Sequence, residues 1–224
     1  MLITDEMNVC FLTTVVINKM LKRRNDKMID LKKIKRLYIF VDTTNAFSKK
    51  GLLADPYVLH TVPELIKIAK IAIADEDGEL MFIIDFHTKD SVEFDRYPEH
   101  GKEGTPEVQI ISELESYAKD ALIFKKNATS AIFSEGFIET ILKMTELEEV
   151  VIVGWDTDIC VMNLAIPLQN LFDEINKRVK IIVPKNAVET YDAPNHNRDE
   201  YNDMAFKFME QAGIKVVKKL ERKR

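Results

Sequence analysis

The sequence has little cysteine, no long apolar run and no excess of basic residues. Its two cysteines, Cys10 and Cys160, are too few for a disulfide framework, and this predicts a reducing compartment, the cytoplasm. No apolar stretch approaches the roughly 20 residues of a membrane-spanning helix, so we expect no membrane insertion. The net charge of −5 gives no indication of a nucleic-acid partner. Hydrophobic residues make up 46% of the chain, enough for a sizeable globular core.

The start of the chain lacks the residue order of a secretory signal. Its mildly apolar stretch, residues 7–20, has acidic residues before it and a basic cluster after it. We interpret residues 1–36 as an N-terminal extension, flexible or helical. An extra helix, a partner-binding segment and translation from an upstream start, with Met28 as the usual one, all stay open. No internal repeat or linker divides the rest, so residues 37–220 are predicted to form one domain.

Apolar, β-rich runs alternate with helical patterns from residue 37 onward. We expect strands at residues 37–41, 80–84, 122–124, 150–153, 179–183 and 214–217. We expect helices at residues 63–74, 106–118, 134–144, 158–175 and 199–212. This alternation predicts an α/β fold, a doubly wound, Rossmann-like sheet of six parallel strands with helices on both faces. The irregular segment 87–104 is long enough to indicate a functional loop.

Reactive side chains follow four of the predicted strands. They are Asp42 after the first, Asp85 and His87 after the second, Lys125 and Lys126 after the third, and Asp156, Asp158 and Cys160 after the fourth. Ligands of open parallel sheets bind outside the carboxyl ends of the strands. Each residue alone has an ordinary structural explanation, because aspartates cap helices, lysines are solvated and a lone cysteine packs as a small hydrophobe. Their conjunction at successive strand ends predicts one active site.

The chemistry of these residues suits acyl transfer through a thioester. Cys160 is expected near the start of a helix, where unpaired N–H groups and the helix dipole favour the thiolate, and the ammonium of Lys126 would add to this effect. A carboxylate beside the thiol can take its proton and later pass it to a leaving group. Backbone N–H groups of the turn at residues 154–160 can stabilise an oxyanion.

A metal site is a separate prediction. The sequence Asp85-Phe86-His87 places two ligands on one side of an extended segment, because side chains alternate in β geometry. The following loop offers Glu93 and His100. Nitrogen and oxygen donors suit Zn²⁺, Mn²⁺ or Fe²⁺ rather than Ca²⁺. A histidine in a loop is more often a surface residue, so spacing alone leaves this site open.

Residues 37–217 resemble the isochorismatase-like cysteine hydrolases, and among them the nicotinamidases. The segment IFVDTTNAF resembles the first strand of this family with its D-x-x-N-x-F motif, KNATSAIF resembles K-x-x-x-S-A-F, and VGWDTDICV resembles G-x-x-T-D-x-C-V. The resemblance implies that Asp42, Lys126 and Cys160 are the catalytic residues, with Lys126 rather than Lys125 at the lysine position. Asp158 matches the T-D pair and is expected to brace the loop.

Two further segments favour the nicotinamidase branch, because many relatives lack the metal. IIDFHTKD resembles the metal-binding D-x-H motif, and YPEHGKEGTPE resembles the segment that carries a later histidine ligand. The resemblance implies that Asp85, His87, Glu93 and His100 bind one divalent metal ion. Glu93 stands seven positions before His100, as in some nicotinamidases, whereas Ser91 stands near the place of a histidine in others. The implied reaction is hydrolysis of nicotinamide to nicotinate and ammonia, a step of NAD salvage.

The same resemblance implies how the substrate is held. The metal would bind the pyridine nitrogen, and Phe47 and Tyr97 would flank the ring, since flat aromatic walls suit a flat ring. A cis peptide between Trp155 and Asp156 would aim the N–H groups of Asp156 and Cys160 into an oxyanion hole. The chain departs from the family at Asp156, where a small apolar or neutral residue is common. A carboxylate there opposes the developing charge unless it points away.

Other functions stay open at this point. A related enzyme of the family would act on another small amide or carbamoyl compound. A response-regulator-like signalling module also carries aspartates and a lysine at strand ends, but it would leave Cys160 and the D-x-H motif unexplained. The intact Asp42, Lys126 and Cys160 argue against a binding protein without turnover. The expected partner is a small-molecule substrate, nicotinamide, and the expected assembly is a homo-oligomer.

Overall fold

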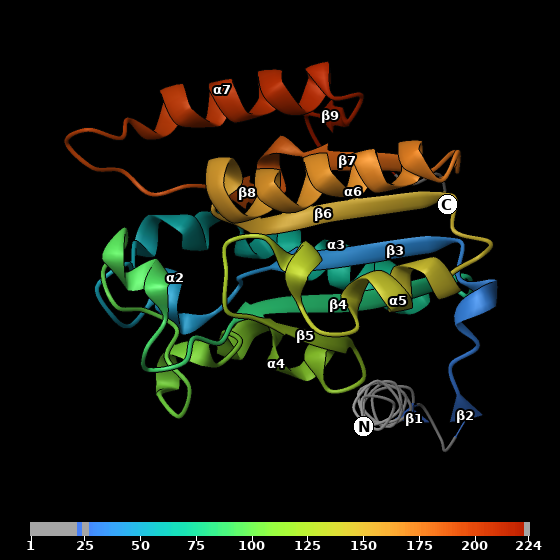
Figure 1. Cartoon of the computed structure of the whole chain (residues 1–224), viewed down its shortest axis with the longest axis horizontal. Helices are drawn as coiled ribbons and strands as arrows, with labels where there is room; N and C mark the ends of the chain where they lie inside the picture. Colours follow the sequence, from blue (N-terminus) through green and yellow to red (C-terminus); the bar gives the residue numbers. More distant parts are fainter. Residues whose placement is uncertain (1–21, 24–26, 222–224) are drawn as a thin grey trace, which may run out of the picture.

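A twisted parallel sheet runs through the centre of the computed structural model, which describes residues 22–23 and 27–221 (Figure 1). The strands follow the order β5-β4-β3-β6-β7-β9, and β8 pairs with β6. Their bounds are β3 Arg36–Val41, β4 Gly78–Asp85, β5 Leu122–Lys126, β6 Glu149–Trp155, β7 Lys180–Pro184, β8 Val188–Glu189 and β9 Lys215–Val217. The predicted single α/β domain with a parallel sheet is confirmed, and the short β8 is a strand that the sequence pattern did not indicate.

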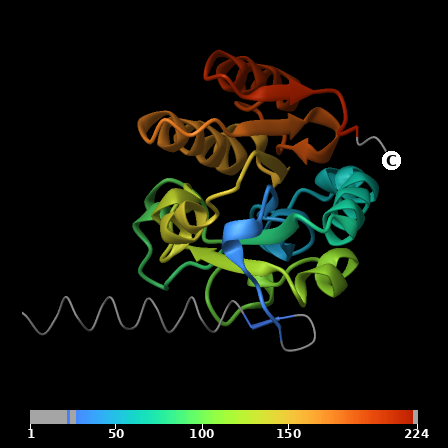
Figure 2. The same cartoon turned by 90° about the vertical axis from the view of Figure 1, so that its right-hand side faces the viewer.

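Helices cover both faces of this sheet. They are α2 (Asn45–Ser48), α3 (Val62–Ala74), α4 (Ser112–Ala118), α5 (Phe137–Lys143), α6 (Met162–Glu174) and α7 (Arg198–Gln211). Figure 2 shows α5 and α6 on one side of the sheet and α3 and α4 on the other. Buried residues of α5, α6 and α7 belong to one apolar cluster, and those of α3 and α4 belong to a second. This is the doubly wound arrangement that the alternating pattern predicts.

The central strand β3 shows why the predicted strands read as unbroken apolar runs. Leu37 and Ile39 face the first apolar cluster, whereas Tyr38 and Phe40 face the second. Alternate side chains point to opposite faces of a strand, and both faces of this sheet are covered by helices. Each of these four residues is 0% exposed. Burying one such side chain contributes about 1.5–3 kcal/mol.

The prediction of a helix over residues 106–118 is wrong for the first half of that range. A short 3₁₀ turn, η4 (Pro106–Val108), begins at the proline, but the chain is then extended before α4 starts. Two backbone bonds hold this extended piece against the segment after β3, from Ile111 N–H to the Thr43 carbonyl at 3.1 Å and from Asn45 N–H to the Gln109 carbonyl at 2.9 Å. These tertiary bonds occupy groups that a continuous helix would have used internally.

The helix expected over residues 134–144 begins later than predicted, at Phe137. Gly136 has a left-handed backbone with φ of 74°, which interrupts helical geometry and which glycine adopts readily. Before the sheet, the described residues include a two-residue antiparallel pair, β1 (Lys22–Arg23) with β2 (Lys27–Met28), and a 3₁₀ turn, η1 (Leu31–Lys33).

Most of the predicted extension, residues 1–36, lies outside the described residues, and the division of the chain near residue 36 stays a prediction. Among the residues that the structure describes, no helix combines the length and the apolarity needed to cross a membrane.

Candidate active site

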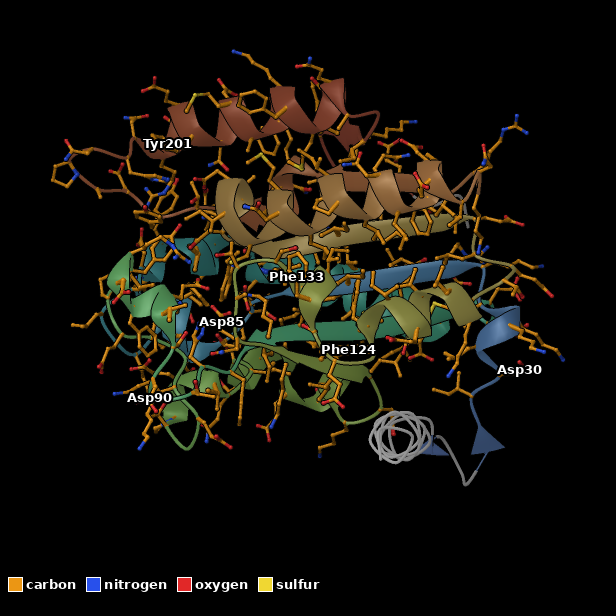
Figure 3. All side chains as sticks on the ribbon, viewed as in Figure 1. Asp30, Asp85, Asp90, Phe124, Phe133 and Tyr201 are labelled. Carbon is orange, nitrogen blue, oxygen red and sulfur yellow. The ribbon has the colours of Figure 1, made fainter. Side chains whose placement is uncertain are left out.

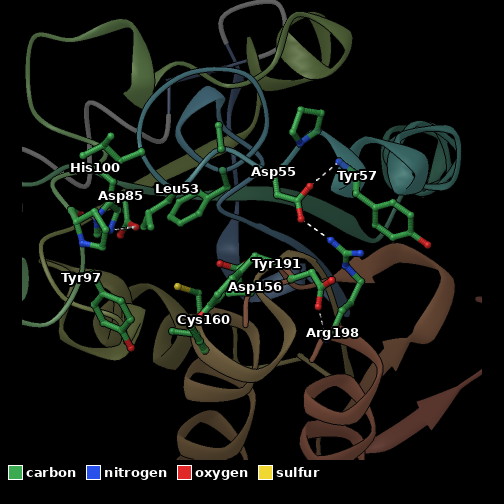
Figure 4. A pocket seen from close by; sticks show the side chains of 18 of the residues that line it. Leu53, Asp55, Tyr57, Asp85, Tyr97, His100, Asp156, Cys160, Tyr191 and Arg198 are labelled. Atoms are coloured by element: carbon green, nitrogen blue, oxygen red, sulfur yellow. Dashed lines mark hydrogen bonds and ion pairs between the residues drawn. The ribbon is translucent and has the colours of Figure 1, made fainter. Parts of the chain in front are cut away.

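A cavity of about 800 Å³ opens beyond the carboxyl ends of the central strands. In Figure 1 these ends face the left, where the long loops gather, and Figure 3 labels Asp85 at the tip of β4. The parallel pairing places Asp85 opposite Lys126, the last residue of β5. The cavity is lined by Phe47, Asp85, Tyr97, His100 and Cys160 among others (Figure 4). Residues from distant parts of the sequence therefore meet where the strand-end rule predicts.

Lys126 is the centre of the buried charges. Its Nζ lies 2.9 Å from Asp42 Oδ2, hydrogen-bonds Asp85 Oδ1, and lies 3.6 Å from Cys160 Sγ. The residue is 2% exposed, so its charge is largely shielded from water. The neighbouring Lys125 points the other way, and its Nζ stacks 3.5 Å from the ring centroid of Phe86. The alternation of side chains along β5 explains why one lysine enters the cluster and the other does not.

Asp42 is held in place by its backbone as well as by Lys126. Its φ of 50° lies in the left-handed region, which residues other than glycine adopt rarely and which is found at functional sites. Its Oδ1 accepts a hydrogen bond of 2.9 Å from the N–H of Asp85. Acidic or sulfur atoms of Asp42, Asp85 and Cys160 lie within 4.8 Å of one another. Asp42 is therefore within reach of a proton on the thiol.

The three charged groups of the cluster have shifted pKa values. Burial and the charge of Asp85 raise the pKa of Asp42 to about 6, against the opposing effect of Lys126. Burial also works to raise the pKa of Asp85, but Lys126 and the neighbouring rings of His100 and His87 outweigh it and lower that pKa. Burial disfavours the charged form of Lys126, yet the two aspartates raise its pKa well above the ordinary value. Lys126 and Asp85 are therefore favoured in their charged forms, and Asp42 is the group of the cluster whose protonation changes near neutral pH.

The Cys160 thiol differs from the expectation that its surroundings favour a thiolate. Burial raises its pKa well above the ordinary value, and nearby Asp42, Asp85 and Asp156 act in the same direction. Lys126 opposes these effects without outweighing them. Three buried carboxyls and the loss of water account for the difference, because they outweigh the helix terminus and the lysine, which favour the thiolate. The resting group is the thiol, and its ionisation requires a proton acceptor.

The loop that carries Cys160 is fixed where it leaves β6. Gly154, with φ of 117°, lies so close to β3 that a side-chain carbon there would collide with the Val41 carbonyl oxygen. Trp155 is fully buried and donates from Nε1 to Thr61 Oγ1 at 3.0 Å. The chain then passes through a single π-helical turn, η6 (Thr157–Val161), into α6. Cys160 thus projects from a turn that cannot shift along the sheet.

The peptide between Trp155 and Asp156 is cis, as the resemblance implies. The N–H of Asp156 donates to no backbone acceptor within the described part of the chain. The N–H groups of Ile159 and Val161 both donate to the Asp156 carbonyl, at 3.2 and 3.0 Å, which closes the turn around Cys160. This arrangement agrees with an oxyanion hole at Asp156 and Cys160, which stays a prediction.

Asp158 is engaged in bracing contacts. Its Oδ1 accepts a hydrogen bond of 2.6 Å from Thr190 Oγ1, and its Oδ2 lies 2.9 Å from His196 Nε2. The His196 ring stacks on Tyr191 at a centroid distance of 3.9 Å. These contacts tie the start of η6 to the segment after β8, in agreement with the expected structural role.

Three of the four predicted metal ligands lie together. Ligand atoms of Asp85, His87 and His100 are within 4.8 Å of one another. His87 Nδ1 lies 3.2 Å from Asn127 Oδ1, and His100 Nδ1 lies 2.7 Å from the Pro98 carbonyl oxygen. Both contacts place the ring proton on Nδ1 and leave Nε2 free as a ligand, the usual arrangement of metal-binding histidines.

The donor set fits a divalent ion. The buried Nε2 of His87 has no hydrogen-bond partner among the described residues, which suits an atom that ligates a metal. Nε2 of His87 and Nε2 of His100 lie 3.5 and 3.4 Å from the two oxygens of Asp85. Burial lowers the pKa of His100, but its hydrogen bond and its charge interaction with Asp85 raise it overall. A metal ion would compete with a proton for this ring.

Glu93 lies apart from this three-residue group. It is buried and lines the cavity, and its Oε1 accepts a hydrogen bond of 3.1 Å from Thr129 Oγ1. Ser91 Oγ lies 3.4 Å from His87 Nδ1, so it contacts the ring on the side away from the free nitrogen. The role of Glu93 as a fourth ligand stays a prediction.

Aromatic side chains border the metal end of the cavity. Phe47 and Tyr97, both predicted, have ring centroids 5.7 and 6.4 Å from that of His100. Phe94, which the sequence analysis missed, packs edge-on against His87 at 5.3 Å. Its position in the irregular segment 87–104, predicted to be a functional loop, is the one sequence signal that bears on it.

The opposite end of the cavity was not predicted. Asp55 pairs with the guanidinium of Arg198, which also lies 3.9 Å over the ring of Tyr57 (Figure 4). Tyr191 and Asp192 follow the two-residue strand β8 and complete this wall. These residues lie away from the four strand ends considered: Asp55 and Tyr57 stand at a 3₁₀ turn before α3, and Arg198 begins α7. A two-residue strand has no recognisable apolar run. No sequence signal identified them.

Comparisons with known proteins agree with this fold and site. A family model described as the isochorismatase domain matches residues 36–219. A search of curated proteins finds no match.

Solved structures with the same fold include amidases of two kinds. An N-carbamoylsarcosine amidase from Thermoplasma acidophilum is 25% identical, with a TM-score of 0.67 over 85% of this chain and 99% of that chain. A pyrazinamidase/nicotinamidase from Streptococcus mutans is 21% identical, with a TM-score of 0.69 over 82% and 100%. A pyrazinamidase from Pyrococcus horikoshii, solved in complex with zinc, is 22% identical, with a TM-score of 0.66 over 82% and 98%.

Proposed function

The chain belongs to the isochorismatase family, and on this premise we propose that it is a metal-dependent cysteine amidohydrolase that converts nicotinamide to nicotinate and ammonia. The observation that carries the proposal is the contact of one buried ammonium, Lys126 Nζ, with Asp42, Asp85 and the Cys160 thiol. This arrangement provides a nucleophile, a proton acceptor and a fixed positive charge within one shielded site.

Asp42 is the proposed proton carrier. Its pKa of about 6 leaves most of it ionised at neutral pH, so it can accept the Cys160 proton as the sulfur attacks the carboxamide carbon. The positive charge of Lys126 keeps both groups in place and favours the anionic forms that arise during transfer. Asp42 then returns the proton to the nitrogen as the C–N bond breaks and ammonia leaves. A water molecule, deprotonated by Asp42, then attacks the thioester carbon. The C–S bond breaks, the carboxylate leaves, and Asp42 returns the proton to the Cys160 sulfur.

Backbone donors in the loop after β6 are proposed to stabilise the tetrahedral intermediate. The N–H groups of Asp156 and Cys160 would donate to the carbonyl oxygen as it becomes an oxyanion. Removing one such donor from an enzyme raises the barrier by about 2.7–4 kcal/mol.

The end of the cavity near Asp85 and His100 is proposed to orient the substrate. When bound by Asp85, His87 and His100, with Glu93 as a further candidate ligand, a Zn²⁺, Mn²⁺ or Fe²⁺ ion supplies a Lewis-acid contact for the pyridine nitrogen. Phe47 and Tyr97 border the space that the ring would fill. The zinc complex of the Pyrococcus horikoshii pyrazinamidase supports the choice of a divalent metal.

Ammonia release from nicotinamide and pyrazinamide tests this proposal. We expect turnover of both compounds, loss of turnover after treatment with a chelator, and recovery when Zn²⁺, Mn²⁺ or Fe²⁺ is restored. Turnover that survives complete metal removal would refute the metal-dependent part. Absence of ammonia release from either compound, with metal present, would refute nicotinamide as the substrate.

A second candidate function is hydrolysis of another small amide or a carbamoyl compound. The cavity volume of about 800 Å³ is near the upper end of the range typical of drug-sized ligands, and its far wall carries polar groups that a nicotinamide ring would not use. The N-carbamoylsarcosine amidase of the same fold supports this alternative. A role in NAD salvage, a cytoplasmic location and a homo-oligomeric assembly accompany the nicotinamidase proposal and stay predictions.

A further inference from the structure

Asp156 presents a buried carboxyl group to the substrate cavity without a partner. The residue is 6% exposed and lines the cavity together with Cys160 (Figure 4). Its side chain does not cap the helical turn that follows it, and within the described residues it forms no side-chain hydrogen bond or ion pair. Asp156 is therefore distinct from the other buried carboxyls of the site, which all have partners.

An unpartnered buried carboxyl is unfavourable in the free protein. Burial and the charges of Asp158, Asp42 and Asp85 raise the pKa of Asp156 well above its ordinary value. The surroundings thus favour either a proton on this carboxyl or a positively polarised group against it. A neutral residue would remove the penalty, so the carboxyl has a stability cost that a ligand would offset.

The remaining charges of the cavity point to the same kind of ligand. The lining contains five carboxyl groups but only two guanidinium groups. The carboxyl groups belong to Asp55, Asp85, Glu93, Asp156 and Asp192, and the guanidinium groups belong to Arg96 and Arg198. Arg198 is already paired with Asp55 and stacked on Tyr57, and Arg96 is exposed at the edge. Away from the proposed metal site, a substrate carboxylate would find no uncommitted buried cation in the lining, whereas an ammonium or N–H donor would find Asp156.

We propose that Asp156 is a specificity-determining residue that binds a cationic or N–H-donating group of the amide substrate and disfavours substrates that carry a carboxylate. The proposal rests on the amidohydrolase function and narrows its substrate class. A cationic group at Asp156 also offsets a negative charge that would otherwise oppose the oxyanion on the neighbouring backbone. The preferred substrate is thus a small primary amide with a second group that is cationic or carries an N–H donor. Nicotinamide has no such group, so this role of Asp156 favours the second candidate function, hydrolysis of another small amide.

Three aliphatic amides of matched length test the proposal, because they share the scissile group and differ only at the other end. They are β-alaninamide with an ammonium, butyramide with a methyl, and succinamate with a carboxylate. We expect kcat/KM to fall in that order, with about tenfold between β-alaninamide and butyramide, the effect of one hydrogen bond to a charged group. Asp156→Asn, which keeps the shape of the side chain, is expected to reduce this ratio to within about twofold.

The control is Asp95→Asn, which removes the same charge from an exposed carboxyl outside the cavity lining. It should leave the order of the three amides unchanged. Binding of the same amides to the Cys160→Ala variant, measured by calorimetry, provides a readout that needs no turnover. Asp156→Ala provides a second variant if Asp156→Asn does not fold.

The outcomes separate this proposal from the proposed function. Equal values for the three amides, a preference that survives in Asp156→Asn, or hydrolysis of nicotinamide with no binding of any of the three would overturn the role of Asp156 alone. If no amide is hydrolysed but Cys160→Ala binds β-alaninamide most tightly, and Asp156→Ala in that background abolishes the preference, the role of Asp156 stands and the amidohydrolase function fails.

Discussion

Asp85 and Asp156 line the same cavity, and both are more than nine-tenths buried. Their pKa values nevertheless move in opposite directions. Burial works to raise both, but Lys126, His100 and His87 outweigh it at Asp85 and lower its pKa. At Asp156 no such partners are present among the described residues, and neighbouring carboxyls raise its pKa further. The difference between the two carboxyls comes from their partners and not from their depth.

The two carboxyls belong to different parts of the site. We call Asp42, Asp85 and Lys126 the balanced region, and the cavity wall around Asp156 the unbalanced region. The cluster around Lys126 has its charges balanced before any substrate arrives, as expected of groups that carry out the same chemical step on every substrate. The wall around Asp156 is balanced only when a ligand contributes a donor or a cation. Such a wall can discriminate among substrates, because a ligand that lacks the matching group leaves a buried polar atom unpaired.

The largest expected effect follows from removing the cation of the balanced region. Lys126→Met leaves Asp42 and Asp85 buried beside each other without compensation. We expect the free energy of unfolding to fall by about 3–5 kcal/mol, the usual result of breaking a buried ion pair. Ammonia release should fall by about a thousandfold, within the range for loss of proton-transfer catalysis. Urea unfolding and the ammonia assay measure the two quantities.

Lys125→Met is the matched control for that variant, because Lys125 precedes Lys126 on the same strand and points to the outside. Its effect on unfolding should stay within about 0.5 kcal/mol, as for most surface substitutions. Equal effects of the two variants would contradict the assignment of Lys126 as the buried charge of the site.

The metal site gives the next largest effect. His87→Ala and Asn127→Ala should each weaken Zn²⁺ binding, the first by removing a ligand and the second by removing the acceptor for its Nδ1 proton. A loss of about 10–100-fold in affinity is expected for the Asn127 variant. Competition with a chromophoric chelator measures the affinity. His60→Ala, which removes an exposed histidine, should have no effect, and comparable losses in all three variants would contradict the site.

The pH dependence of activity tests the proton carrier of the balanced region. Asp42 must be ionised to accept the thiol proton, and its pKa is about 6. Below that pH, kcat/KM should therefore fall by about tenfold per pH unit, while above it this group imposes no further change. Ammonia release measured across the pH range checks the profile. A rate that stays constant through pH 6 would exclude Asp42 as the base.

The smallest expected effect is on the free energy of unfolding and comes from the carboxyl of Asp156. A group whose pKa is raised by folding stabilises the protein below its unfolded-state pKa and loses that contribution as the pH rises. The ordinary value for Asp156 is 3.8, so Asp156→Asn should match the wild type below that pH and become more stable than it above. We expect a gain of about 1 kcal/mol near neutrality. Urea unfolding at several pH values measures this difference, and a variant that is less stable than the wild type at neutral pH would contradict the comparison.

The sequence predicts much of the balanced region, because that region depends on local rules. Apolar runs locate the strands, and their ends locate Asp42, Asp85 and Cys160. Alternation along β5 then explains why Lys126 and not Lys125 enters the cluster. These inferences need only the period of a strand and the geometry of a parallel sheet.

The unbalanced region depends on tertiary contacts that no local rule contains. Asp156 is visible in the sequence, but the absence of a partner for its carboxyl depends on loops that are distant in sequence. Arg198 is committed to Asp55, which lies 143 positions away, and this pairing has no signature in the sequence. The extended start before α4 is a similar case, since its backbone bonds to Thr43 and Asn45 override the helix pattern that Pro106 suggested. The raised pKa of Cys160 likewise depends on three carboxyls that meet only in the fold.

The central claim is that Cys160 is the nucleophile of an amide hydrolase. Ammonia release from nicotinamide by the metal-loaded wild type, Cys160→Ala and Cys10→Ser tests it most directly, because each variant removes one of the two cysteines. We predict that Cys160→Ala loses at least about a thousandfold in rate while Cys10→Ser keeps the wild-type rate. A Cys160→Ala variant that releases ammonia at nearly the wild-type rate would contradict the account.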